Sequence, residues 1–287
     1  MEQAAEISSV AAEPASRTDA PRGSPRYGAY LAAIQRDKRK VVICQVALVL
    51  GFLVLWQIAP KLGWVNPMLT SYPTAVLATL SSLMADGTLF THTFATLKST
   101  VIGFTGGMVL GILAAVALWW SPFLYRTLDP FVVVLNALPK IALVPIFYIW
   151  LGDKSSIYAM AIVISVFVTI LMLYTGFCAI DPNKIKLVRI WGASRFQVLT
   201  KVILPGSVPT MISTLKVNIG LALVGVVVGE FQAANQGLGF LINYGSQIFQ
   251  MNLVMASIVS LAAVSTLLFI AVQFAESLIM RRRSIAA

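Results

Sequence analysis

Long apolar runs separated by short polar connections make up most of the chain. A helix needs about 20 apolar residues to cross the hydrocarbon core of a bilayer. Six runs reach that length and predict transmembrane helices at about 41–60, 97–119, 130–151, 157–179, 209–231 and 253–279. The pattern therefore predicts an all-α polytopic membrane protein with six transmembrane helices. An even number of crossings leaves both ends of the chain on one side.

The segments that flank these runs differ from them in composition. Residues 1–26 are rich in Ala, Ser, Pro and charge, which is typical of a disordered tail. Residues 27–40 predict a short interfacial segment, because apolar positions on one side precede a basic cluster. The membrane domain spans 41–280, and 281–287 form a basic C-terminal segment. A signal peptide is not expected, since the first apolar run lacks a clear small-residue cleavage site.

The basic residues of the connections predict the orientation. Sixteen Lys and Arg fall on the side of the two termini, and at most three fall on the opposite side. Basic residues are retained on the cytoplasmic side of a membrane. Both termini and the connection at 181–209 are therefore expected in the cytoplasm, with the chain in the inner membrane of a bacterium.

Composition excludes several classes of function. The chain is 58% hydrophobic and 11% charged, and its net charge of +10 reflects membrane topology better than nucleic-acid binding, because the charges lie between the apolar runs. Cys44 and Cys178 lie within apolar runs and are expected to be packing residues. His92 is the only histidine, so no His-based metal site or catalytic triad is supported. No phosphate-binding GxxxxGK[ST] loop occurs, so we expect no ATP hydrolysis and no bound cofactor.

The connection at 181–209 is the longest polar segment between apolar runs. Asp181-Pro182 predicts a helix start, because Pro is tolerated at the first helical position. Gly192 separates two short amphipathic helices, and Leu204-Pro205 is expected to end the second. We expect Trp191 and Phe196 to be packed, and Ser194→Ala to have little effect. The segment is thus predicted to be a helix–turn–helix outside the hydrocarbon.

This segment resembles the cytoplasmic loop of permease subunits from binding-protein-dependent ABC importers. That loop carries Glu-Ala-Ala, three residues, Gly, nine residues and Ile-x-Leu-Pro. Gly192 takes the Gly position here, and Val202, Leu204 and Pro205 follow at the right spacing. Residues 186–188 depart from the pattern, since Lys-Leu-Val replaces Glu-Ala-Ala. The ATPase-coupling loop that the resemblance implies comprises Arg189, Trp191, Gly192, Ala193, Ser194, Arg195, Val202, Leu204 and Pro205.

The resemblance implies a fold, partners and a mechanism. The fold would be that of a type I ABC importer permease, covering about 65–280. A second copy of the chain, two cytoplasmic ATPase subunits that bind ATP and magnesium, and an external substrate-binding protein would complete the importer. Closure of the ATPases would draw the paired Gly192 loops together and open the pathway outward.

The predicted third helix contains two prolines and a lysine. Pro139 and Pro145 inside an apolar run predict a kink, and Lys140 between them either faces a polar interior or extends to the cytoplasmic interface. The stretch 138–152 is similar to the matching helix of permeases for sulfonates, taurine, nitrate and related small anions, and for thiamine precursors. Ser71-Tyr72-Pro73-Thr74 and Gly229-Glu230 resemble the same subgroup. The substrate expected from it is a small anion such as a sulfonate, taurine, nitrate or bicarbonate, or a heterocycle.

Other polar and small residues of the membrane domain leave alternatives open. Glu230 is either part of the extracytoplasmic gate or a boundary acid in water, and it joins Pro139, Lys140 and Pro145 as a candidate pathway residue. Lys216 is expected to extend to the interface, and Glu276 to be solvated. The small residues of 103–115 and 220–229 favour packing within the chain over a subunit interface.

Two other classes of function compete with the importer subunit. A secondary transporter or channel that works alone would require intramembrane acids, His residues or related halves with broken helices, and these are not apparent. An intramembrane enzyme would require a group of catalytic side chains that the chain lacks.

Overall fold

The computed structural model describes residues 25–286 and divides into two compact units, 1–59 and 60–287. Helix α2 (Pro25–Lys61) accounts for the described part of the first unit. It runs without a break through the predicted interfacial segment and contains the first predicted span. The predicted tail lies almost wholly outside the described residues. Within the described residues the chain is helical and has no strand.

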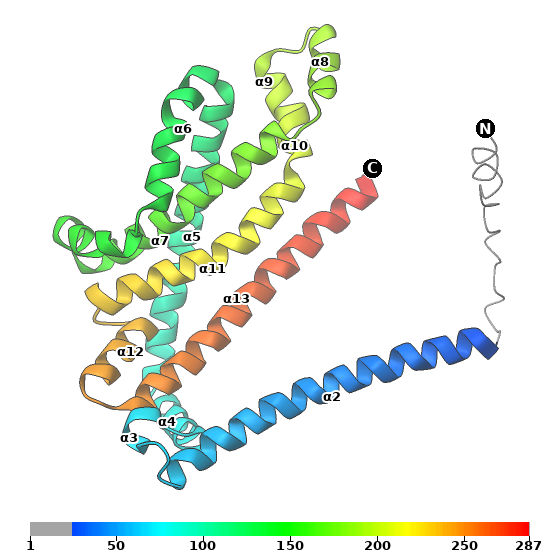
Figure 1. Ribbon diagram of the computed structural model, residues 1–287. Helices are drawn as coiled ribbons and strands as arrows, with labels where there is room; N and C mark the ends of the chain where they lie inside the picture. The colour runs from blue at the N-terminus through cyan, green and yellow to red at the C-terminus, as the bar shows by residue number, and fades with distance from the viewer. Residues whose placement is uncertain (1–24, 287) are drawn as a thin grey trace, which may run out of the picture. The chain divides into compact units, whose positions relative to one another are not determined.

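The second unit is a set of long helices joined by short ones (Figure 1). Prolines stand in the first turn of several of them, where their missing N–H leaves no hydrogen bond unmade. In chain order the helices are α3 (Pro67–Thr70), α4 (Pro73–Ala85), α5 (Thr88–Trp120), α6 (Pro122–Ala137), α7 (Val144–Cys178), α8 (Pro182–Ile190), α9 (Arg195–Val198), α10 (Leu204–Gly206), α11 (Val208–Ala233), α12 (Leu238–Gln247) and α13 (Met251–Ala286).

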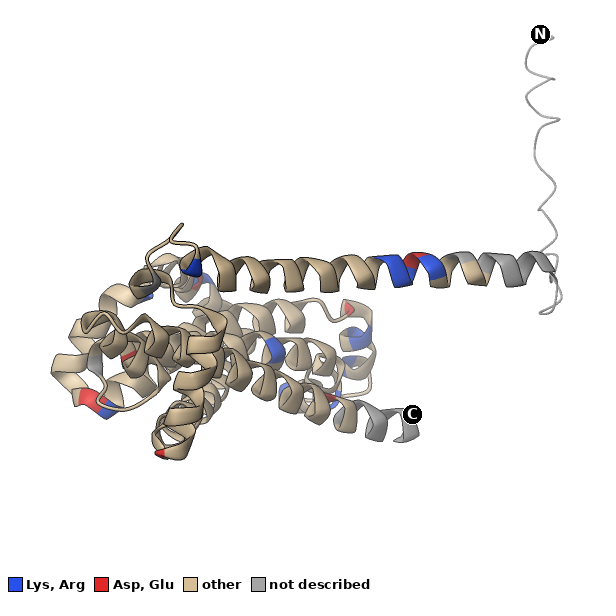
Figure 2. Ribbon diagram, turned by 90° about the horizontal axis from the view of Figure 1, so that it is seen from below, with Lys and Arg blue, Asp and Glu red and all other residues tan. Residues whose placement is uncertain are grey.

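Five helical segments of the described chain are long and apolar enough to cross a membrane. They cover Ile34–Lys61, Thr88–Trp120, Lys140–Cys178, Val208–Gln232 and Met251–Leu278. Figure 2 shows that the long helices of the second unit carry few charged residues along their length. The predicted all-α membrane architecture is confirmed, but the described residues contain five such segments where six were predicted.

The prediction of one continuous helix over 130–151 is wrong. Helix α6 ends at Ala137, a 3-10 turn covers Lys140–Leu143, and α7 begins at Val144. Leu138 is extended because a residue that precedes proline is driven out of the helical region, and Pro139 is extended as well. Gly152, with φ 75° and ψ 179°, then interrupts α7. In Figure 1, α6 turns back from the end of α5, so the third predicted span is a bent segment.

The centre of the second unit is formed by α5, α7 and α11. Gly103, Gly107 and Gly111 of α5 face Ala161, Ser165 and Thr169 of α7, one after another. Two glycines of α11, Gly225 and Gly229, also lie close to the backbone of α7. Small side chains allow helix backbones to come close, which favours association where no water is available to drive it. The expectation that the small residues serve packing within the chain is confirmed at these positions.

Candidate functional site: the α8–α9 loop and the polar contacts of the helix ends

The connection between α7 and α11 forms a compact helical loop at one end of the second unit (Figure 1). Asp181 caps α8, since its carboxylate accepts the N–H of Asn183 at 2.8 Å. After α8 the chain turns at 191–194, and α9 continues through a π-helical turn (Leu199–Ile203) into α10. The predicted helix–turn–helix is therefore present.

Gly192 forms the turn between the two helices. Its φ is 83°, a left-handed conformation that costs a side-chain-bearing residue free energy and a glycine almost none. The N–H of Gly192 donates to the carbonyl of Arg189 at 2.9 Å, and that of Ala193 to the carbonyl of Val188 at 3.1 Å. A Cβ on Gly192 would meet no atom within 4 Å. Backbone conformation, and not crowding within the chain, therefore requires glycine here.

Ser194 begins the second helix of the loop as a capping residue. The N–H of Gln197 donates to its hydroxyl at 3.3 Å, and the N–H of Ser194 donates to the Gln197 side chain at 2.8 Å. This reciprocal pair satisfies two backbone donors that the helix start would leave unpaired. The expectation that Ser194 could be replaced at little cost overlooked this cap.

One side of the loop is anchored in the unit. Val198, Leu199 and Ile203 are buried against Leu173 and Phe177 of α7, in a cluster that also includes Ala115 of α5. Apolar contacts of this kind stabilise the loop in one orientation. Packed side chains therefore connect the loop to α5 and α7.

The opposite side of the loop carries exposed apolar residues. Ile190 is 80% exposed, Trp191 78% and Phe196 64%. The expectation that Trp191 and Phe196 are packed is therefore wrong within this chain. Arg189 and Arg195 lie beside them in sequence, and the guanidinium of Arg195 is 6.0 Å from the ring centroid of Trp120. We call the surface of Ile190, Trp191 and Phe196 the loop face; aromatic residues together with arginine are typical of protein interfaces.

Leu204 and Pro205 do not end the helix as predicted. Leu204 has helical angles, φ −60° and ψ −48°, and the interruption comes at Ser207. The π-helical turn that contains Val202 precedes Pro205 and loosens the hydrogen-bond ladder where proline has no N–H to donate. The helix therefore continues past the proline and ends at Gly206, and α11 begins at Val208.

The broken segment around Lys140 joins α6 to α7. The ammonium of Lys140 donates to the carbonyl of Asn136 at 2.7 Å, in the last turn of α6, and is 5.9 Å from the ring centroid of Phe167. A cation at a helix C-terminus pairs with carbonyls that have no partner in the helix. Pro139 precedes the 3-10 turn and Pro145 lies in the first turn of α7, so neither proline interrupts the interior of a helix.

Glu230 is buried at the end of α11 farthest from the α8–α9 loop. It is 1% exposed, and its carboxylate accepts the hydroxyl of Thr96 at 2.9 Å and the N–H of Gly239 at 2.9 Å. The hydroxyl of Thr96 also accepts the N–H of Leu238 at 2.8 Å. The alternative of a boundary acid in water is therefore wrong.

These contacts link three helices, and we call Glu230, Thr96 and Gly239 the α5–α11–α12 cluster. Gly237, at φ 122°, passes so close to the Glu230 carboxylate that a Cβ would overlap it. The N–H of Gly237 donates to Nδ1 of His92 at 3.0 Å. Sequence reasoning missed Thr96 and His92, because nothing in the local pattern of α5 connects them with a residue more than 130 positions away.

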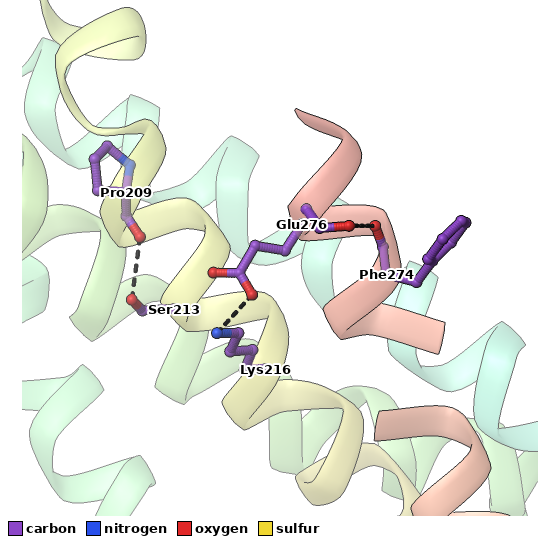
Figure 3. A network of polar contacts seen from close by, with 6 residues as sticks. Pro209, Ser213, Lys216, Phe274 and Glu276 are labelled. Carbon is purple, nitrogen blue, oxygen red and sulfur yellow. Dashed lines mark hydrogen bonds and ion pairs between the residues drawn. The ribbon is translucent and has the colours of Figure 1, made fainter. Parts of the chain in front are cut away.

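Lys216 and Glu276 form an ion pair between α11 and α13, with Nζ and Oε2 2.6 Å apart (Figure 3). Both side chains are partly exposed, at 35% and 25%. The expectations of an interfacial Lys216 and of a solvated Glu276 did not include this pair. Among the residues described, no three His, Cys, Asp or Glu side chains form a group that could hold a metal ion.

A bundle of apolar helices with an anchored loop whose outer face is aromatic and basic defines a membrane-spanning subunit that works with partner proteins. The chain belongs to the family described as "Binding-protein-dependent transport system inner membrane component", whose model matches residues 107–285. It is a permease subunit of an ABC importer, as its resemblance implied. The alternative of a transporter or channel that works alone is not supported.

Relatives of known name support this assignment. The chain is 27% identical over 233 residues to the putative aliphatic sulfonates transport permease protein SsuC of Bacillus subtilis, covering 81% of this chain and 84% of the relative. It is 28% identical over 234 residues to the taurine transport system permease protein TauC of Escherichia coli, covering 78% and 85%. The formylaminopyrimidine transport permease protein ThiX of Halalkalibacterium halodurans is 28% identical over 232 residues, covering 80% and 92%.

Solved structures agree with the fold. An inward-facing MetNI methionine ABC transporter contains a chain that matches with a TM-score of 0.57 at 21% identity, covering 66% of this chain and 93% of that chain. A chain of an amino acid ABC transporter matches with a TM-score of 0.56 at 16% identity, covering 71% and 97%. The expected importer permease fold is confirmed.

Proposed function

We propose that this chain forms the substrate pathway of an ATP-driven importer in a bacterial inner membrane, with both termini in the cytoplasm. The excess of basic residues around 181–209 and at the two ends supports this orientation. The chain contains no phosphate-binding loop, so the energy comes from partner ATPase subunits that hold ATP and magnesium.

The loop face is the proposed docking surface for one ATPase subunit. The single observation that carries this proposal is the exposure of Ile190, Trp191 and Phe196 on a loop that is otherwise anchored in the unit. Exposed aromatic residues beside arginine fit a protein partner better than a solvated surface. Because Val198 and Ile203 pack on α5 and α7, ATP-driven movement of the partner would shift these helices and alternate the access of the pathway.

Two further partners follow from this arrangement. A second copy of the chain would complete the pathway as a homodimer, so that two loop faces meet two ATPase subunits. A substrate-binding protein would dock on the opposite side of the membrane, where the α11–α12 connection lies. The family description names dependence on a binding protein, which supports this partner.

The proposed substrate is a small organic anion of the sulfonate or taurine type. The relatives SsuC and TauC carry these substrates in their names, and the basic character of the chain favours anions. A heterocycle is the second candidate, since ThiX is named for formylaminopyrimidine and a relative from Chloroflexus aurantiacus for riboflavin.

Reconstitution in liposomes tests the proposed function. The complex with its ATPase and loaded binding protein should accumulate ethanesulfonate or taurine only with ATP, whereas the chain alone should hydrolyse no ATP. Uptake by the chain alone, driven by an ion gradient, would contradict the proposal. Uptake of a pyrimidine but of no sulfonate would favour the second candidate substrate.

A further inference from the structure

A cavity of about 510 Å³ opens at the end of the second unit opposite the α8–α9 loop. Its walls come from two helices and one connection: the first turns of α5, the part of α7 just after Gly152, and the connection that follows α11. The residues that line it are Thr91, Phe94, Ala95, Lys98, Ser99, Asp153, Lys154, Ile157, Tyr158, Ala234, Asn235 and Gln236. The cavity belongs to neither the loop face nor the α5–α11–α12 cluster.

The charged groups of this cavity favour an anion. Lys98 and Lys154 contribute two ammonium groups against the single carboxylate of Asp153. Asp153 accepts the side-chain N–H of Asn235 at 3.3 Å, whereas neither lysine contacts a carboxylate or a hydrogen-bond acceptor among the residues described. Two cations without a partner, one from α5 and one from α7, attract negative charge into the cavity, and the attraction is stronger at low dielectric than in bulk water.

A third polar group in the cavity lacks a partner. Ser99 is only 7% exposed, lines the cavity and makes no hydrogen bond within the described part of the chain. Among the described residues only Asn218 Oδ1 is a buried side-chain atom without a partner, so the Ser99 oxygen is open to the cavity and not sealed in the interior. The Ser99 hydroxyl, one residue after Lys98, is therefore available to an acceptor oxygen in the cavity.

The remaining walls suit a short organic group. Phe94, Ile157 and Ala234 are apolar, and the phenol of Tyr158 adds a further donor. Sites for small ligands are concave and largely apolar, with a few polar groups that orient the ligand. A free inorganic anion would leave the apolar wall without a contact.

We infer that this cavity binds a small organic anion, whose sulfonate or carboxylate group is held by Lys98, Lys154 and Ser99. The inference rests on the proposed function, because the ligand would be the transported anion at its entry to the pathway. The positive charge of the two lysines is opposite to that of the ligand. The cavity also combines polar and apolar residues, as the ligand combines an anionic group with a short apolar chain. A lysine ammonium serves as a point charge for a sulfonate without requiring one fixed geometry.

Binding of ethanesulfonate to the assembled permease–ATPase complex tests this inference. The complex is held in nanodiscs of phosphatidylcholine without binding protein, and the dissociation constant is measured by calorimetry. Lys98→Gln and Lys154→Gln should each weaken binding about tenfold, the effect of losing about 1.4 kcal/mol. Lys61→Gln, which removes an exposed lysine that does not line the cavity, is the matched control and should leave binding unchanged.

Salt and uptake measurements complete the test. Raising NaCl from about 50 mM to about 500 mM should weaken binding to the wild type more than to the double variant, because salt screens the two charges. In liposomes with saturating binding protein, the double variant should take up ethanesulfonate more slowly than the wild type. Each variant must elute as the intact complex, which separates loss of binding from loss of assembly.

Several results would overturn the inference. Unchanged binding and uptake in the double variant would remove the site while leaving the proposed function intact. Recovery of uptake by the double variant at binding-protein concentrations above those that saturate the wild type would make the cavity a docking point for that protein. Displacement of ethanesulfonate by added phosphatidylglycerol at trace levels would indicate a lipid headgroup site. If the wild type transports no sulfonate but binds it, the proposed substrate fails and the anion site stands.

Discussion

Gly192 and Gly87 have similar positive φ angles but belong to connections at opposite ends of the second unit. Their φ values are 83° and 71°, and a Cβ on either would meet nothing within 4 Å. Gly192 turns the chain in the α8–α9 loop, and Gly87 precedes α5 at the other end of the unit. The two positions therefore separate the effect of backbone strain from the effect of location.

We expect Gly192→Val to reduce ATP-driven uptake strongly and Gly87→Val to reduce it little. Each substitution forces a β-branched residue into the left-handed region at a cost of about 1–2 kcal/mol. Only the strain at Gly192 disturbs the loop face. Uptake and the amount of co-purified ATPase are measured for both variants. Equal losses at the two sites would contradict the coupling role of the loop.

Ser194→Ala is unsuitable as a neutral control for that experiment. The substitution removes the hydroxyl that accepts the N–H of Gln197, and loss of such a cap costs about 1 kcal/mol. We expect reduced protection of the α9 amides from hydrogen exchange in Ser194→Ala, while Ser194→Thr should retain protection. Unchanged exchange in Ser194→Ala would show that the cap does not stabilise the loop.

The α5–α11–α12 cluster should be sensitive to the loss of its carboxylate. Glu230→Ala leaves the hydroxyl of Thr96 and the N–H of Gly239 without their acceptor, at a cost of about 1–3 kcal/mol for each buried donor. The thermal unfolding midpoint of the purified chain in detergent should fall by several degrees. Asp86→Ala, which removes an exposed acid near the same end, should change it little. A midpoint that is the same in both variants would show that the cluster is not stabilising.

At the scale of elements, the close approach of α11 to α7 depends on single glycines. A Cβ at Gly225 would lie 2.6 Å from Cα of Ala161 and 3.0 Å from its backbone nitrogen. Backbone atoms cannot move aside as a flexible side chain can. At Gly220, on the same helix, a Cβ would meet nothing within 4 Å.

Gly225→Ala should therefore separate α11 from α7, and Gly220→Ala should not. Overpacking of a tight interface costs about 1–3 kcal/mol. Resistance of the detergent-solubilised chain to limited proteolysis measures the difference, with Gly225→Ala cleaved faster. The packing described here would be incorrect if Gly220→Ala proved the more damaging of the two.

The elements also show where a pattern of hydrophobicity is insufficient. Residues 130–151 are apolar enough for one helix, yet the backbone leaves the helical region at Leu138 and Pro139. Hydropathy averages over a window and does not register that one proline excludes its neighbour from the helix. At Pro205 the opposite happened, because a π-helical turn accommodated the proline within a continuing helix.

At the scale of the whole molecule, the proposed orientation predicts the location of three connections. Reporter fusions at Asp86 and Gln236 should report the outside, and a fusion at Lys186 the cytoplasm. Asp86 directly follows α4 and Gln236 directly precedes α12, and Figure 1 shows these two helices at the end of the second unit opposite α8. The physical reason is the retention of basic segments in the cytoplasm. A cytoplasmic signal at Asp86 would overturn the orientation, and a shared signal at Asp86 and Lys186 would overturn the topology.

The sequence by itself determined the class of protein, because apolar runs of membrane length and the spacing of Gly192 with Leu204-Pro205 are local properties. It also indicated that small residues of α5 and α11 pack within the chain, since lipid-embedded helices need close approach. Only the tertiary structure decided which polar groups meet. Thr96 and Glu230, Lys216 and Glu276, and the lysines of the cavity are far apart in the chain. A hydrogen bond or ion pair depends on atoms within about 3 Å, and that proximity is set by the packing of whole helices.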